Sequence, residues 1–231
     1  MTGRATLRGR RFAVLDDFLD GAALEEARRT MAASAFSAAE SPLLTGQDGA
    51  LRSRGTVVRG AAAGRGAAGD PAAYGLVRSA VAAEPELFGR PGEDWDRVGF
   101  TFWNYPVGSG LAWHGDAGGG RRGSYVLFLN EEWRASWGGE LMVLDEEEVD
   151  TGTAELQVRE SASSPVAIVP RPNRLVLLRA GTPHRINRVD PTAALVRCSL
   201  TGFAMKRPDE AGADARARFR ELVGALKGAS E

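Results

Sequence analysis

A series of short apolar runs between Val98 and Gly202 constrains the fold more than any other feature of the sequence. The runs are four to eight residues long, and glycine, proline or asparagine separates them at intervals of about ten residues. They span residues 98–105, 124–129, 141–144, 166–169, 175–178 and 195–202. Short strands at this spacing are typical of a β-sandwich or barrel, so we expect a mainly β core.

Helices are expected on the N-terminal side of this core. The segment beginning at Phe12 is predicted to form a short strand that leads into a helix with Asp20 as its N-cap. A second helix should start at Asp70-Pro71, with a capping carboxylate and a proline in the first turn, and should end before Glu84-Pro85. Between them, residues 45–69 are rich in Gly, Ala and Arg without periodicity, which predicts a flexible loop that is a candidate lid.

A third helix is expected near the end of the sequence. Residues 209–228 carry an apolar stripe at helical spacing: Phe219, Leu222, Val223 and Leu226. The acidic run that starts at Asp145 is expected to be a solvated hairpin loop. We therefore predict one domain over residues 1–231 in the α+β class, with support in 1–97, a β core in 98–205 and the C-terminal helix.

Composition excludes several classes of protein. The 29 basic and 30 acidic residues give a net charge of −1, which provides no electrostatic footprint for nucleic acid or an anionic membrane. The single cysteine, Cys198, rules out an internal disulfide and a multi-cysteine metal site. The sequence contains no apolar run of 18 residues and no apolar signal-peptide core at its start. We expect a cytoplasmic monomer or homodimer that acts on a small molecule.

The chain has only two histidines, His114 and His184, so any histidine chemistry must use one or both. In His114-Gly-Asp116 an imidazole and a carboxylate are two residues apart, and in a strand such residues point to the same side. His184 follows the predicted strand 175–178. Two histidines and one carboxylate from distant strands form the facial triad of non-haem iron(II) oxygenases, which leaves coordination positions open for a co-substrate and O2.

Arg197 is the next candidate for a binding residue. In the predicted strand 195–202, Arg197, Ser199 and Thr201 share one face. An arginine that points into a barrel is costly unless it meets an anion, and a guanidinium can hold a carboxylate through two charge-assisted bonds. The alternative is an arginine at the rim of the barrel that extends to water.

Several stretches in this order resemble the prolyl-4-hydroxylase-like branch of the iron(II) and 2-oxoglutarate-dependent dioxygenases. The resemblance covers roughly residues 98–205. The matching stretches are Tyr105-Pro-Val-Gly108 with Leu111, His114-Gly-Asp116, Arg121-Arg-Gly-Ser124 through Asn130, Trp137-Gly-Gly-Glu-Leu141, Pro183-His184 and Arg197 to Gly202. The resemblance implies a double-stranded β-helix, or jelly roll, that binds Fe(II), 2-oxoglutarate and O2, with ascorbate as a candidate reductant.

The resemblance also implies roles for individual residues. His114, Asp116 and His184 would bind the iron, and Arg197 would hold the distal carboxylate of 2-oxoglutarate. Many members have a tyrosine that also contacts 2-oxoglutarate, but here the residue is Phe128, so a hydroxyl of Ser199 or Tyr105 is expected to take its place.

The expected activity is hydroxylation of an unactivated C–H bond in a free amino acid or a specialised-metabolite intermediate, coupled to conversion of 2-oxoglutarate to succinate and CO2. Trp103, Trp137 and Arg122 are candidate substrate residues, although large aromatics are more often core and arginines more often surface residues. The alternatives are a peptidyl-prolyl or protein hydroxylase, and a non-catalytic jelly-roll binding protein with a vestigial metal site.

Overall fold

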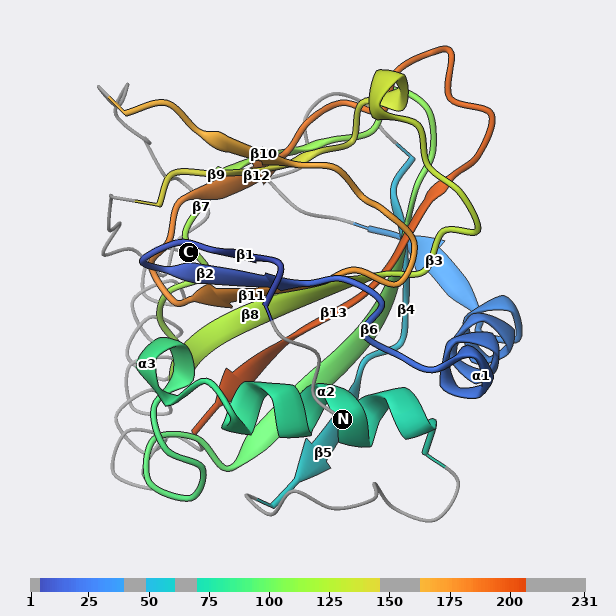
Figure 1. Cartoon of the computed structure of the whole chain (residues 1–231). Helices are drawn as coiled ribbons and strands as arrows, with labels where there is room; N and C mark the ends of the chain where they lie inside the picture. Colours follow the sequence, from blue (N-terminus) through green and yellow to red (C-terminus); the bar gives the residue numbers. More distant parts are fainter. Residues whose placement is uncertain (1–4, 40–48, 61–69, 146–162, 207–231) are drawn as a thin grey trace, which may run out of the picture.

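The computed structural model describes residues 5–39, 49–60, 70–145 and 163–206, and it consists mainly of two antiparallel β-sheets (Figure 1). The large sheet has the order β1-β2-β11-β8-β13-β6-β4-β3, and β5 also pairs with β6. Its strands are β1 (Leu7–Arg8), β2 (Phe12–Leu15), β3 (Phe36–Ala38), β4 (Leu51–Ser53), β5 (Thr56–Arg59), β6 (Arg97–Tyr105), β8 (Arg121–Phe128), β11 (Leu175–Arg179) and β13 (Arg197–Met205).

The small sheet lies above the large one in Figure 1 and has the order β10-β9-β12-β7. Its strands are β7 (Leu111–His114), β9 (Leu141–Val143), β10 (Val166–Ile168) and β12 (His184–Ile186). The helices are α1 (Gly21–Ala32), α2 (Ala72–Ala82), α3 (Pro85–Phe88) and a 3-10 turn at Ala135–Trp137. Helices α2 and α3 lie on the opposite side of the large sheet from the small sheet, which gives the predicted jelly-roll core with flanking helices.

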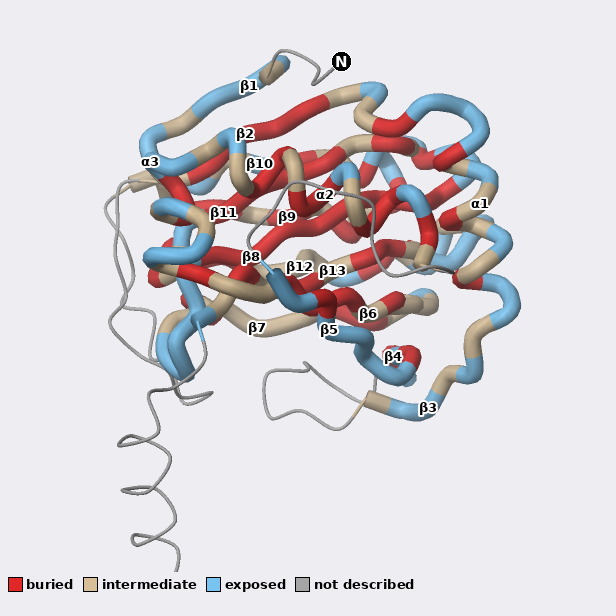
Figure 2. The backbone as a smooth tube through the Cα atoms, turned by 90° about the horizontal axis from the view of Figure 1, so that it is seen from below, coloured by how far each residue is buried: buried red, intermediate tan, exposed pale blue. Residues whose placement is uncertain are grey.

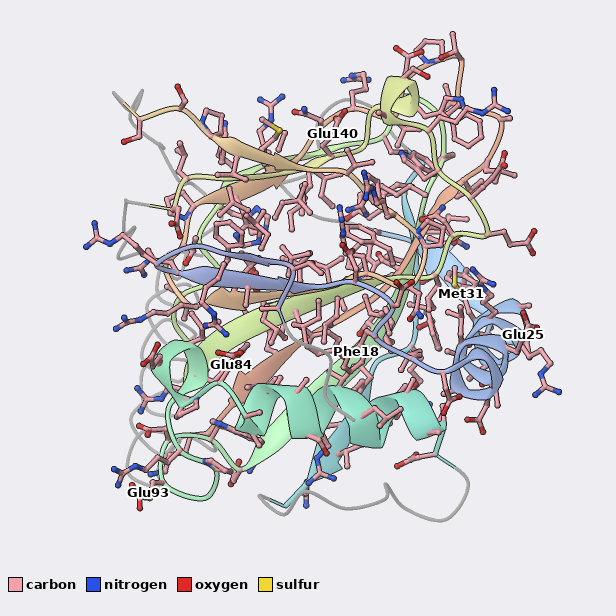
Figure 3. All side chains as sticks on the ribbon, in the orientation of Figure 1. Phe18, Glu25, Met31, Glu84, Glu93 and Glu140 are labelled. Atoms are coloured by element: carbon pink, nitrogen blue, oxygen red, sulfur yellow. The ribbon has the colours of Figure 1, made fainter. Side chains whose placement is uncertain are left out.

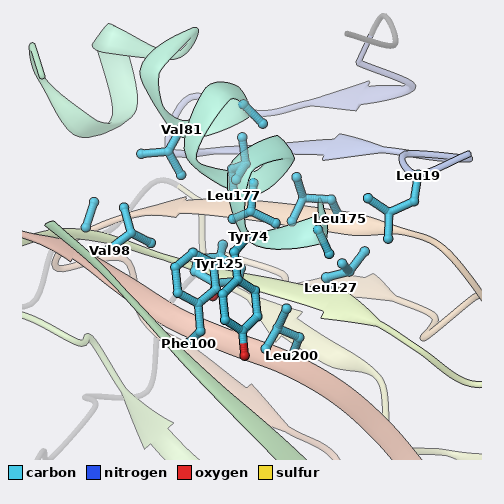
Figure 4. Close-up of a cluster of buried hydrophobic side chains, with 14 of the residues drawn as sticks. Leu19, Tyr74, Val81, Val98, Phe100, Tyr125, Leu127, Leu175, Leu177 and Leu200 are labelled. Atoms are coloured by element: carbon cyan, nitrogen blue, oxygen red, sulfur yellow. The ribbon is translucent and has the colours of Figure 1, made fainter. Parts of the chain in front are cut away.

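The two faces of the large sheet contact different layers because side chains alternate along each strand. In β8, Tyr125 and Leu127 point toward the helices, where Tyr74 of α2 stacks on Phe100 with ring centroids 4.0 Å apart (Figure 4). The other face, which we call the inner face, packs Val126 and Phe128 against the small sheet. Side chains fill the space between the sheets (Figure 3), and buried residues follow the central strands (Figure 2).

All six apolar runs form strands. The sequence did not predict the extent of β7 and β12, which are only four and three residues long. These two strands carry the histidines and pair with each other, with His184 opposite His114. Short strands have too few alternating positions for a pattern to appear, so pairing with neighbouring strands determines their conformation.

Helix α1 begins as predicted. The carboxylate of Asp20 accepts a hydrogen bond of 2.8 Å from the backbone N–H of Ala23, which satisfies one of the free amides of the first turn. Asp20→Ala is expected to lower the free energy of unfolding by about 1 kcal/mol. Urea denaturation of the variant and the wild type measures this difference, and an unchanged midpoint would contradict it.

The start of α2 differs from the prediction. Pro71, and not Asp70, occupies the N-cap position, and no side chain caps the helix there. The backbone N–H of Ala72 instead donates to Glu26 of α1 at 2.8 Å. A carboxylate that is distant in sequence therefore binds the first free amide, and only the packing of α1 beside α2 makes this possible.

The predicted loop 45–69 is also wrong in its described part. Residues 51–53 and 56–59 form β4 and β5, both of which pair with β6. Residues 45–48 and 61–69, and with them most of the candidate lid, lie outside the described residues. Composition hid these strands because they are short and lie beside the edge of the sheet, where polar residues are common.

The other predictions for loops and termini are tested only in part. The C-terminal helix 209–228 and acidic residues 146–150 lie outside the described residues. Asp145 is not simply solvated, because its carboxylate accepts hydrogen bonds of 2.7 Å from the backbone amides of Arg10 and Arg11. Within the described ranges, no helix is long and apolar enough to span a bilayer.

Candidate active site

Strands β7 and β12 bring the two histidines together. Their antiparallel register places His114 directly opposite His184, and the two ring centroids are 4.2 Å apart with the planes inclined by 52°. Both side chains are buried. The 68 residues that separate His184 from Asp116 in sequence are therefore bridged by one pair of short strands.

Asp116 completes a cluster of three donors. It follows β7 with a positive φ of 54°, and its Oδ1 lies 3.5 Å from Nε2 of His114. Its Oδ2 lies 3.1 Å from Nε2 of His184. One donor atom from each residue lies within 4.8 Å of the others, so a single cation can contact all three. Among the described residues this is the one cluster of histidine, cysteine or acidic side chains that meets this criterion.

The remaining nitrogen of each histidine is held by the backbone. Nδ1 of His114 lies 2.8 Å from the carbonyl of Ala112, and Nδ1 of His184 lies 2.8 Å from the carbonyl of Thr182. A hydrogen bond from Nδ1 to a carbonyl keeps the proton on that nitrogen and leaves the lone pair of Nε2 for a metal. Two imidazole nitrogens and one carboxylate oxygen suit Fe(II), so the donor set is consistent with the predicted metal.

Burial and mutual contact set the protonation of the cluster. Burial lowers the pKa of His114 to about 4, and the neighbouring His184 adds to this effect. Burial also disfavours charge on His184, but the Asp116 carboxylate outweighs it and raises the pKa of His184 above its usual value. For Asp116, burial favours the protonated form, but both histidines and the hydroxyl of Ser124 hold its pKa well below its usual range.

These shifts predict how metal affinity depends on pH. Metal binding requires both imidazoles to be neutral. Because the pKa of His184 is raised, His184 is protonated over part of the pH range and must lose that proton before the metal can bind. Metal affinity should therefore rise by about tenfold per pH unit up to the pKa of His184 and then level off. Protonation of His114 should steepen the loss only as the pH approaches about 4. Calorimetric titration with Mn(II) between pH 5.5 and 8.5 tests this, and equal affinities at pH 5.5 and 7 would contradict it.

Ser124 is the first of two residues of the candidate site that the sequence did not predict. It is buried on the inner face of β8, and its hydroxyl hydrogen-bonds to the carboxylate of Asp116. Such partners orient metal ligands. The alternation of β8 could have placed Ser124 on the inner face, but its contact with Asp116 depends on the turn between β7 and β8.

Arg197 lies on the same inner face and is completely buried. Its Nε donates to the carbonyl of Gly139 at 2.8 Å. Nη1 and Nη2 are buried without a hydrogen-bond partner in the described structure, and so is Oγ of the neighbouring Ser199. Buried polar groups without partners are rare and costly. A carboxylate between the guanidinium and the hydroxyl would satisfy all three atoms, so this site fits the distal carboxylate of 2-oxoglutarate.

Aromatic rings surround this guanidinium. The centre of the guanidinium lies 4.9 Å from the ring centroid of Phe128 and 5.3 Å from that of Tyr105. Both distances are within the range of cation–π attraction. Burial lowers the pKa of Arg197 to about 10, so the group stays positively charged at neutral pH. Phe128 and Tyr105 thus contact Arg197 with their ring faces.

Gly139 is a second residue that the sequence reasoning missed. It has a positive φ of 66°, and a Cβ there would lie 3.0 Å from Cδ of Arg197. Any side chain would press on the arginine, while the carbonyl of Gly139 binds its Nε. The signal was present in the matching stretch Trp137-Gly-Gly-Glu, whose second glycine is Gly139.

Of the three candidate substrate residues, two aromatic ones lie in one cluster and the arginine lies elsewhere. Trp103 is partly exposed on β6 and stacks on Tyr105 with ring centroids 5.7 Å apart. Trp137 is buried and packs edge-on against Trp133 at 5.4 Å. Arg122 points to Asp94, with its Nε 3.0 Å from the carbonyl oxygen and Nη2 3.7 Å from the carboxylate. Trp103 and Trp137 belong to one hydrophobic cluster with Tyr105, whereas Arg122 is held apart at Asp94. The roles of the three residues stay predictions.

Residues 100–205 contain the three candidate metal donors and Arg197, and they match the sequence model of the family described as the 2OG-Fe(II) oxygenase superfamily. The match confirms that this β core resembles the iron(II) and 2-oxoglutarate-dependent dioxygenases. No curated protein sequence matches the chain. The predicted class, a 2-oxoglutarate-dependent dioxygenase, is therefore confirmed, and this superfamily uses Fe(II), 2-oxoglutarate and O2.

Solved structures share the fold of this oxygenase. A prolyl-4-hydroxylase from Pseudomonas putida has a TM-score of 0.60 and 19% identity, over 86% of this chain and 94% of that one. A prolyl hydroxylase from Trichoplax adhaerens, in complex with a hypoxia inducible factor peptide fragment, has a TM-score of 0.56 and 18% identity, over 85% and 84%. The epimerase SnoN, in complex with Fe3+, alpha ketoglutarate and nogalamycin RO, has a TM-score of 0.55 and 16% identity, over 86% and 82%. The jelly-roll fold is confirmed.

Proposed function

We propose that this oxygenase hydroxylates an unactivated C–H bond, with Fe(II) on His114, Asp116 and His184. Arg197 would bind the distal carboxylate of 2-oxoglutarate. The observation that carries the proposal is the completely buried guanidinium of Arg197, with two nitrogens lacking partners in the described structure, on the face that also meets the donor cluster. Neither the buried guanidinium nor the donor cluster stabilises the fold by itself. Bound 2-oxoglutarate would satisfy the guanidinium, and a bound metal ion would satisfy the donor cluster.

Strand β8 links the two halves of the proposed site. Its inner face carries Ser124, which contacts Asp116, and Phe128, which contacts Arg197. Four residues separate them, a rise of about 13 Å along the strand. An elongated dicarboxylate can therefore lie along this face, with one end at the metal donors and the other at the guanidinium.

The bound metal and co-substrate would supply oxidation of a C–H bond with O2. The protein's own residues bind and orient these groups. Asp116 and the Nε2 atoms of His114 and His184 would hold the cation, and the backbone carbonyls fix the histidine tautomers. Arg197 and Ser199 align the co-substrate, and the buried rings of Phe128 and Tyr105 exclude water from that end.

The proposed substrate is a small molecule, namely a free amino acid or an intermediate of a biosynthetic pathway. SnoN, which shares the fold, supports this class because it is in complex with nogalamycin RO. The Trichoplax enzyme with its peptide fragment favours the alternative, a peptidyl-prolyl or protein hydroxylase. A vestigial metal site is the second alternative, and the complete donor set argues against it.

Succinate formation tests the proposal directly. Purified protein with Fe(II), 2-oxoglutarate and air should release succinate, and candidate small molecules should accelerate the release. Protein treated with a chelator is the control for metal dependence. Complete absence of metal-dependent succinate, with and without candidate substrates, would contradict the proposal and favour a vestigial site. A use of ascorbate, a cytoplasmic location, a single domain and a monomeric or dimeric state stay predictions.

A further inference from the structure

A turn of three glycines connects Asp116 to Arg121, the first residue of β8. Gly118, Gly119 and Gly120 all have positive φ values, of 88°, 62° and 77°. The backbone N–H of Arg121 closes the turn on the carbonyl of Gly118 at 3.1 Å. Such a run of left-handed residues is easy only for glycine, and it places Arg121 five residues after a proposed metal ligand.

A β-bulge then separates the directions of Arg121 and Arg122. Gly123 opposes Ala204 of β13 and Arg121 opposes Met205, so Arg122 is the extra residue. Bulges of this kind redirect side chains. The guanidinium of Arg121 lies over the ring of Phe203, 4.1 Å from its centroid, whereas Arg122 extends to Asp94.

Arg121 is connected to the donor cluster through two neighbours on the large sheet. Phe203, which supports its guanidinium, is directly opposite Ser124 in the register of β13 and β8. Ser124 in turn contacts the carboxylate of Asp116. The guanidinium of Arg121 therefore lies at the end of the inner face that is near the donor cluster, away from Arg197.

The guanidinium of Arg121 has N–H groups that can bind a ligand. Arg121 is exposed, and it makes no ion pair with another residue in the described ranges. Stacking on Phe203 occupies one face of the group and leaves the N–H groups at its edge. A planar cation fixed in this way can bind a carboxylate through two parallel hydrogen bonds.

The neighbouring surface suits an organic body of modest size. Thr201 and Thr101 oppose each other on the same face, and Trp103 is the next inward residue of β6. These three side chains and Phe203 are only partly buried, whereas Val126, Phe128 and Ser199 of the same face are buried. Two threonine hydroxyls and the ring of Phe203 lie near this cation, and Trp103 lies further along the face, opposite Ser199. Such a surface favours a compact acid over a neutral or cationic ligand.

We propose that Arg121 binds a carboxylate of the primary substrate, so that this oxygenase acts on small organic acids. The inference rests on the proposed function, because it assumes that the substrate approaches the donor cluster from the side of Phe203. The inference restricts the substrate class to molecules that carry a carboxylate. This carboxylate would bind at the turn after Asp116, and the oxidised C–H bond would belong to the same molecule.

Binding measurements on the enzyme loaded with Fe(II) and 2-oxoglutarate, without O2, test the inference. The probes are the common amino acids as N-acetyl acids and as the matching N-acetyl primary amides. A proline peptide with a free and an amidated C-terminus forms the second arm. At least one small acid should bind at least tenfold more tightly than its amide. Amides that bind as well as the acids, peptides that bind alone, or no binding by any acid would overturn it.

Variants assign the contact to one arginine. Arg121→Gln should lose at least tenfold in affinity for that acid, and Arg121→Lys should retain part of it because the charge remains. Arg122→Gln is the matched comparison from the adjacent position. A loss in Arg122→Gln alone would overturn the assignment. So would a loss of 2-oxoglutarate affinity in Arg121→Gln, because the cation would then serve the co-substrate.

The design separates the two proposals. Binding of Fe(II) and 2-oxoglutarate to the wild type is measured first, without any probe. Failure at this stage contradicts the proposed function itself. Success at this stage followed by no preference for acids contradicts only the role of Arg121.

Discussion

Arg197→Ala is expected to weaken 2-oxoglutarate binding by roughly 30-fold or more, while metal binding persists. The variant removes both charge-assisted bonds to the distal carboxylate and leaves that carboxylate next to the buried rings of Phe128 and Tyr105. Metal binding should remain because Arg197 belongs to the large sheet, whereas the three donors lie in β7, β12 and the turn after β7.

Calorimetry with Mn(II)-loaded protein measures both affinities. Arg188→Ala is the control, since Arg188 is exposed and donates to the carbonyl of Gly108. Arg197→Lys should restore part of the binding through its charge, but without the second parallel bond. Because loss of Arg197 could also disturb the fold, thermal unfolding of the variant is compared with wild type. A folded Arg197→Ala variant with unchanged 2-oxoglutarate affinity would exclude this role, with Arg188 and Arg179 the next candidates.

His184→Ala is expected to reduce metal affinity by more than about 100-fold and to abolish metal-dependent succinate formation. Loss of a residue that merely orients a ligand costs 10- to 100-fold, so loss of one of three direct ligands should cost more. His114→Ala should behave in the same way, because both Nε2 atoms face Asp116 in the paired strands. The smaller side chain removes a buried imidazole without introducing a charge.

Competition with a chromophoric chelator measures the metal affinity of each variant. Ser124→Ala is the matched control, since Ser124 contacts Asp116 without offering a ligand atom of its own, and its affinity should fall by a smaller factor. A folded His184→Ala variant that binds metal as tightly as the wild type would place the metal elsewhere, outside the cluster of three donors.

The metal donors could be predicted from the sequence because the chain has few residues that could form such a site. Two histidines and a nearby carboxylate left little choice, and alternation in one strand placed Arg197 and Ser199 on the same face. The roles of Ser124 and Gly139 were not predictable in this way. Each depends on a contact between strands that are distant in sequence, and such contacts require the register of the sheet.

In the fold, too, local sequence patterns predicted some elements, while others depend on tertiary contacts. Long apolar runs such as 98–105 and 195–202 became central strands because many alternating positions agree. The strands β4, β5, β7 and β12 were missed or undefined because three or four residues carry little pattern. The capping of α2 by Glu26 was missed for a related reason, since it follows from the packing of two helices.

The visible absorption spectrum of the protein with Fe(II) and 2-oxoglutarate, recorded without O2, tests the central claim most directly. A keto acid chelated to Fe(II) gives a weak charge-transfer band that neither component gives alone. The wild type should develop this band only when both are added, and His184→Ala should not develop it. Absence of the band in the folded wild type, or its full intensity in His184→Ala, would contradict the assignment of the metal to His114, Asp116 and His184.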